Sequence, residues 1–68
     1  NCYEEGITYL QESIEIRRKL LADNRIPYKQ LIMVLDRIKE IYKLTGKEEM
    51  LLETETEIEK IISDNKKS

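Results

Sequence analysis

One cysteine, a row of glutamates and a short basic run are the residues of this 68-residue chain that could carry chemistry. Cys2 could act as a nucleophile, but a thiol needs a neighbouring base or cation to become the reactive thiolate. The sequence contains no histidine to supply that base. We therefore expect Cys2 to be an incidental or partly buried thiol and not a catalytic group.

The glutamates of residues 53–59 have the spacing of side chains that share a helix face. Glu53 and Glu57 are four residues apart, as are Glu55 and Glu59. Hard cations prefer ligand loops with mixed oxygen donors, and no such loop occurs in this sequence. Zinc sites and disulfide frameworks are excluded by the single cysteine and the missing histidine. We expect a solvated acidic face, with no metal and no cofactor.

The basic run Arg17-Arg18-Lys19 could contact phosphate, but the rest of the chain does not support a nucleic-acid interface. The formal net charge is −2, and the last third of the sequence is rich in glutamate, whereas a DNA-reading helix is basic. Three cations near a helix end are expected to complement the helix dipole. No glycine-rich phosphate loop and no general base are present, so we expect neither an enzyme nor a nucleic-acid-binding protein.

These residues must be positioned by helices, because the chain is 38% charged and has only two glycines and one proline. A central helix is predicted over 27–44, where apolar residues recur at helical spacing, at Tyr28, Leu31, Leu35, Ile38 and Tyr42. Further apolar residues widen this face on both sides. A helix that is apolar over so much of its circumference needs more than one neighbour.

Two further helices are predicted on either side, over about 3–22 and 47–63. Asn24 can take the left-handed conformation that ends a helix, and Pro27 suits the first turn of the next one. Gly46 marks the second break, where Thr45 and Glu48 also have capping-box spacing. Residues 63–68 are expected to form a polar, frayed tail. Such short loops predict antiparallel neighbours.

The predicted fold is therefore a single all-α domain over residues 1–68, an antiparallel three-helix unit. The longest apolar run, 31–35, is far shorter than the roughly 20 residues that span a bilayer. No charged leader precedes an apolar stretch, so we expect a cytoplasmic protein without a membrane partner. The first residue is Asn1, and we expect the chain to be a fragment or terminal part of a longer helical-repeat protein.

The first and third predicted helices resemble each other, because residues 3–7 are similar to residues about 45 positions later. Segment 3–16 also resembles the second helix of a tetratricopeptide repeat. Gly6, Leu10 and Ser13 stand at the small, large and small packing positions of that family.

The rest of the chain continues this resemblance. Segment 17–24 with Pro27 is similar to the longer linker of the kinesin-light-chain type of repeat. Leu35, Ile38 and Tyr42 match the large positions of a first helix, and 46–49 matches the turn after it. The chain would then span half a repeat plus one repeat.

The resemblance implies a non-catalytic module that binds or scaffolds proteins or peptides. In such a repeat the central helix lines the concave face. Counted from Leu35, the residues expected to contact a partner are Met33, Asp36, Arg37, Glu40 and Lys43.

Two alternatives remain open from the sequence. A chain this small is marginal alone, so its apolar surface could be completed by a second copy in a homo-oligomer. It could also be the regulatory appendage of a larger protein. Met33 and Ile32 lie off the main apolar stripe, and they could form a docking patch or be covered by the flanking helices.

Overall fold

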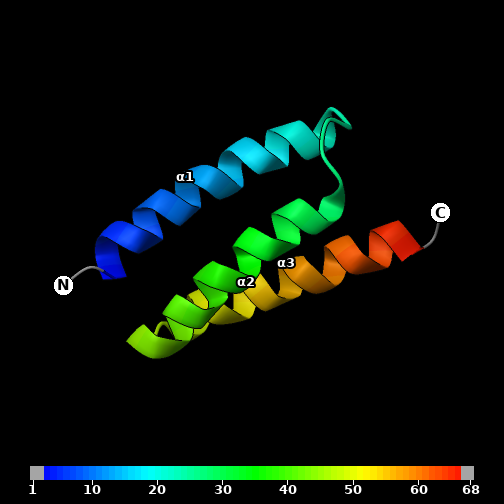
Figure 1. Cartoon of the computed structure of the whole chain (residues 1–68). Coiled ribbons are helices and arrows are strands. Elements are labelled where there is room, and N and C mark those ends of the chain that lie inside the picture. The colour runs from blue at the N-terminus through cyan, green and yellow to red at the C-terminus, as the bar shows by residue number, and fades with distance from the viewer. Residues whose placement is uncertain (1–2, 67–68) are drawn as a thin grey trace.

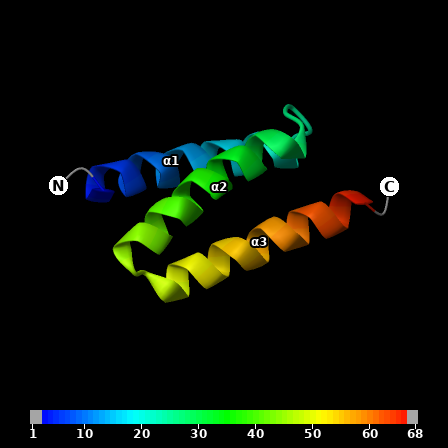
Figure 2. The same cartoon turned by 60° about the horizontal axis from the view of Figure 1, so that its bottom comes forward.

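The central helix α2 (Tyr28–Thr45) packs against both α1 (Tyr3–Ala22) and α3 (Glu48–Lys66) (Figure 1). The computed structural model describes residues 3–66. Consecutive helices are antiparallel, so α1 and α3 run in the same direction, and their backbones do not pack against each other (Figure 2). The described chain measures 41 × 19 × 13 Å along its principal axes. The predicted all-α three-helix unit is confirmed.

α1 and α2 end in the same way, with one left-handed residue that turns the chain back. Asn24 has φ 59°, and the amides of Asn24 and Arg25 donate to the carbonyls of Leu21 and Leu20 at 2.9 and 2.8 Å. Gly46 has φ 72°, and the amide of Lys47 donates to the carbonyl of Tyr42 at 2.9 Å. These bonds satisfy carbonyls that a helix end leaves unpaired, which is why Asn24 and Gly46 end their helices.

The helix boundaries differ from the predicted ones in detail. Pro27 lies just before α2 as its N-cap, with φ −70° and ψ 149°, and not inside the first turn. The hydroxyl of Thr45 donates to the carbonyl of Ile41 at 2.8 Å, inside its own helix. The predicted capping box with Glu48 is therefore wrong, because the Thr45 hydroxyl is already engaged in α2.

The prediction that α3 ends at Ser63 and continues as a frayed tail is also wrong within the described residues, since the helix extends to Lys66. No glycine or proline follows Gly46 that could stop it. The side-chain amide of Asn65 donates to the carbonyl of Ile61 at 2.8 Å, which supports the last turn.

The core lies along one face of α2. Leu31, Leu35, Ile38 and Tyr42 are only 1–3% exposed, and each apolar side chain of this kind contributes about 1.5–3 kcal/mol when buried. Ile7 and Ile14 cover this face from α1. α3 covers it with Leu51, Ile58 and Ile61, which are only partly buried, and with the buried Thr54. The interpretation of α2 as the covered central helix is confirmed.

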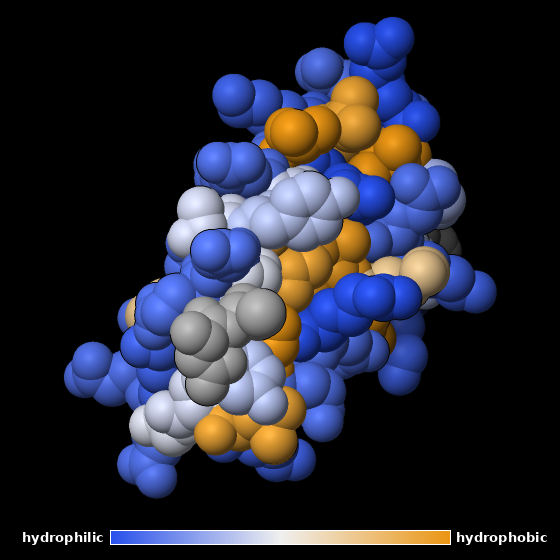
Figure 3. Space-filling model, turned by 60° about the vertical axis from the view of Figure 1, so that its left-hand side comes forward, coloured by the Kyte–Doolittle hydropathy of each residue, from blue (hydrophilic) through white to orange (hydrophobic). Residues whose placement is uncertain are grey.

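Several large apolar side chains remain outside this core. The most exposed lie on all three helices: Tyr9, Ile16, Met33, Leu44 and Leu52. On the face drawn in Figure 3, apolar patches are separated by polar side chains. No helix within residues 3–66 combines the length and the apolar character needed to span a bilayer.

Candidate binding surfaces

The five residues predicted to contact a partner lie together on the side of α2 that faces away from its core. All five are exposed, and Met33 is 61% exposed. Their spacing of three, four and seven residues places them on one helix face. We call this surface the outward face of α2, made up of Met33, Asp36, Arg37, Glu40 and Lys43.

The outward face carries both charge signs around one apolar side chain. Asp36 forms an ion pair of 3.6 Å with Lys39, at the edge of this face. The side chains of Arg37, Glu40 and Lys43 make no hydrogen bond or ion pair with any other residue in the range 3–66. These three charged groups are therefore available to an external partner without breaking an internal contact.

Ile32 and Met33, which could either form a docking patch or be covered by the flanking helices, differ in their exposure. Met33 is exposed, whereas Ile32 is half-buried. The flanking helices thus cover Ile32 in part and leave Met33 free, because Met33 points farther from both neighbours on the helix circumference.

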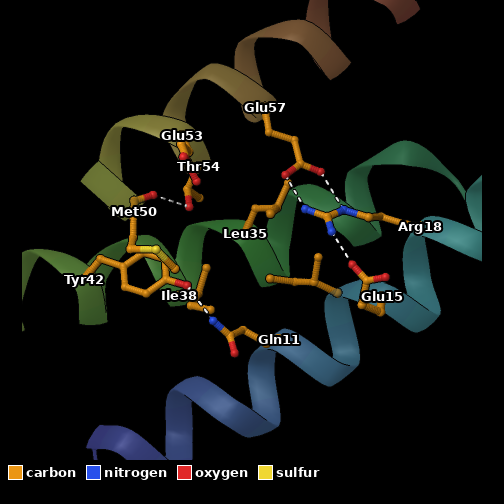
Figure 4. Close-up of a pocket in the computed structure, with 11 residues that line it drawn as sticks. Gln11, Glu15, Arg18, Leu35, Ile38, Tyr42, Met50, Glu53, Thr54 and Glu57 are labelled. Carbon is orange, nitrogen blue, oxygen red and sulfur yellow. Dashed lines mark hydrogen bonds and ion pairs between the residues drawn. The ribbon is translucent and has the colours of Figure 1, made fainter. Parts of the chain in front are cut away.

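A cleft of about 360 Å³ lies on the other side of α2, between α1 and α3 (Figure 4). Its floor is formed by core residues of α2, namely Leu35, Ile38 and Tyr42. One wall consists of Gln11, Ile14, Glu15 and Arg18 from α1, and the other of Met50, Glu53, Thr54 and Glu57 from α3. The sequence did not predict this cleft.

Arg18 and Glu57 close the cleft between its two walls. Nε and Nη2 of Arg18 donate to the two carboxylate oxygens of Glu57 at 2.9 and 2.6 Å, and Nη1 donates to Glu15 (Figure 4). The hydrogen bond to Glu57 raises the pKa of Arg18 above its ordinary value, while burial opposes this shift. The guanidinium of Arg18 thus binds the carboxylates of both Glu15 and Glu57. We call the contact between Arg18 of α1 and Glu57 of α3 the interhelical clasp.

Two further polar contacts lie in the cleft, one between the α1 wall and the α2 floor and one within the α3 wall. The side-chain amide of Gln11 donates to the hydroxyl of the buried Tyr42 at 3.2 Å, and the hydroxyl of Thr54 donates to the carbonyl of Met50 at 2.8 Å. These contacts satisfy groups that the helices bury, and they bring no nucleophile and base together.

The residues considered for chemistry in the sequence are separated by the fold. Within residues 3–66 no group of acidic or sulfur side chains has the arrangement of a metal site. The basic run does not form one cationic patch, because Arg18 turns to Glu57 while Arg17 donates to the hydroxyl of Ser13. Cys2 lies outside the described residues.

The comparisons with known proteins give no family to which this chain could be assigned. No family model, no curated protein and no solved structure matches it.

Proposed function

We propose that this chain is a non-catalytic module of helical-repeat type that binds or scaffolds proteins or peptides, similar to tetratricopeptide repeats of the kinesin-light-chain type. The observation that supports this most is the packing order: α2 contacts both neighbours, and α1 and α3 do not pack on each other. Helical-repeat proteins have this property, since each element contacts only its neighbours and the stack remains open.

The proposed contact surface is the outward face of α2. A partner would meet the exposed Met33 with an apolar group and place complementary charges beside Arg37 and Glu40. The partner is a protein or peptide and not a nucleic acid or membrane, because the face has no excess of positive charge. The proposal places this function in the cytoplasm.

The test begins by selecting binding peptides from a random library displayed on phage. Each selected peptide is then titrated into the ¹⁵N-labelled chain while amide chemical shifts are recorded. We expect the largest shift changes on the outward face of α2. The charge-reversed variant Arg37→Glu with Glu40→Lys should weaken binding about tenfold or more, as the loss of two complementary contacts would.

A matched control keeps the net charge and reverses another exposed pair. Glu59→Lys with Lys60→Glu changes α3 in the same way and should leave the affinity unchanged. Shift changes confined to the α1–α3 cleft would contradict the assigned surface. A library that yields no binding peptide would contradict the proposed function itself.

A further inference from the structure

A second apolar stripe runs along α1; within residues 3–66 its middle is exposed, at Tyr9 and Ile16, while its other members are half-buried. We call it the α1 seam; its members alternate at spacings of three and four residues, and they are Gly6, Tyr9, Ser13, Ile16 and Leu20. Tyr9 is 71% exposed and Ile16 is 58% exposed, while Ile7 and Ile14 of the same helix are buried against α2. Alternation of this kind is the pattern of a helix that pairs with one other helix.

Gly6 supports a close helix neighbour from outside the fold. A glycine inside a helix lowers its stability relative to alanine, so it usually has a packing reason. Within this fold there is little such reason, since a Cβ at Gly6 would meet only Cδ1 of Ile41, at 3.7 Å, an ordinary contact. Gly6 and Ser13 lie seven residues apart on the seam, where small side chains let another helix approach.

We propose that the α1 seam pairs antiparallel with the α1 seam of a second copy of this chain. A two-fold axis near Ser13 makes the seam complementary to itself. Tyr9 then packs on the partner's Ile16, and Gly6 receives the partner's Leu20. Large residues face small ones or fill the space beside them, which allows the two helices to interdigitate.

The charges beside the seam select the antiparallel direction. Glu5, Glu12 and Lys19 are exposed along one edge of α1, and none of them forms an ion pair with another residue of the described range. Antiparallel pairing brings Glu5 beside the partner's Lys19 at both ends of the interface. In a parallel pair this edge of the two copies would lie on opposite sides of the seam, so Glu5 would not meet the partner's Lys19.

Glu12 lies near the proposed axis and faces the partner's Glu12. This pair of like charges opposes association, so we expect a weak dimer. Removing the charge of Glu12 should raise its affinity. The outward face of α2 belongs to another helix and stays uncovered in this dimer. The inference is therefore independent of the proposed function, and either can fail without the other.

Sedimentation velocity on the intact chain, from about 10 µM to about 1 mM, tests the proposal through its charges. We expect a concentration-dependent dimer. Lys19→Glu alone and Glu5→Lys alone should each raise the dissociation constant about tenfold, because each converts two attractive pairs into repulsive ones. The double variant Glu5→Lys with Lys19→Glu should return to the original affinity, and Glu12→Gln should bind more tightly.

A variant of the seam and a matched control distinguish pairing through this surface from non-specific association of exposed apolar side chains. Ile16→Gln should raise the dissociation constant at least about tenfold while the helical circular dichroism is unchanged. Leu52→Gln removes a side chain of α3 that is 66% exposed and should have no effect. The proposal would be overturned if the chain stayed monomeric, or if Ile16→Gln left the dissociation constant of the dimer unchanged. A double variant no tighter than the single ones would overturn the antiparallel pairing.

Discussion

Arg18 of α1 and Glu57 of α3 form a two-bond ion pair between two helices whose backbones do not pack on each other. The pair spans the cleft above the core face of α2 (Figure 4). It connects residues 39 positions apart in sequence and bridges the two outer helices.

A double-mutant cycle should find a coupling energy of about 1 kcal/mol between Arg18 and Glu57. The two-bond geometry favours a larger value, but the side chains are 45% and 28% exposed, so solvent screens the attraction. Urea denaturation of the Arg18→Ala, Glu57→Ala and double variants measures this energy. Because the pKa of Arg18 is raised, its charge persists to the highest pH at which the fold can be measured, and alkaline pH should not remove the coupling.

The ion pair of Lys47 with Glu4 provides the control for this cycle. It has a longer N–O distance of 3.8 Å and a Glu4 side chain that is 77% exposed, so its coupling should be too small to measure. Equal coupling energies for the two pairs would show that the clasp geometry has no special role.

Ile38→Ala should destabilise the chain by about 3 kcal/mol, because it leaves a cavity where the three helices meet. Ile38 is 1% exposed, and a core of this size supplies only about 3–5 kcal/mol in total, so about 0–2 kcal/mol should remain and up to about half of the molecules should be unfolded at 25 °C. Thermal melting followed by circular dichroism tests this. Leu44→Ala, at a residue that is 69% exposed on the same helix, should change the free energy of unfolding by less than about 0.5 kcal/mol. Similar losses from both variants would mean that α2 has no single buried face.

The two glycines should respond in opposite directions to alanine. Gly6→Ala should stabilise the monomer by up to about 1 kcal/mol, because the new methyl group meets only an ordinary contact in the fold. Gly46→Ala should destabilise it by about 1 kcal/mol, since φ 72° holds the backbone in the left-handed conformation, which is unfavourable for alanine. Chemical denaturation at micromolar concentration measures both. A destabilising Gly6→Ala would show that α1 and α2 need the glycine for their own contact.

Helices and their order could be predicted from the sequence because local signals agreed with the apolar spacing. Asn24 and Gly46 have positive φ and end α1 and α2 as expected. The end of α3 could not be predicted by composition, since polar residues near Ser63 are as compatible with an exposed last helical turn as with a tail. Thr45 is ambiguous in the same way, because its hydroxyl could accept from the amide of Glu48 in a capping box or donate to a carbonyl of the preceding helical turn.

The surfaces were harder to predict than the helices. The exposure of the five residues on α2 followed from periodicity, because they lie opposite the core stripe. The cleft did not, since the spread between α1 and α3 depends on how much of α2 each one covers. The sequence predicts that Arg18 complements the dipole at the end of its own helix. Its pairing with Glu57 depends on how closely α1 and α3 approach each other, and apolar periodicity gives no information about that distance. The shared spacing of Gln11, Glu15 and Arg18 on one side of α1 was the available signal.

The most direct test of this account is the solvent exposure of α2, measured residue by residue with a soluble gadolinium chelate in NMR spectra. The account predicts strong relaxation enhancement at Met33, Arg37 and Glu40, and little at Leu35 and Ile38, because α1 and α3 cover only one side of α2. Uniform enhancement around the helix would contradict the packing of α2 between its neighbours. Protection of Met33 and Arg37 in the monomer would contradict an open outward face, and with it the proposed binding surface.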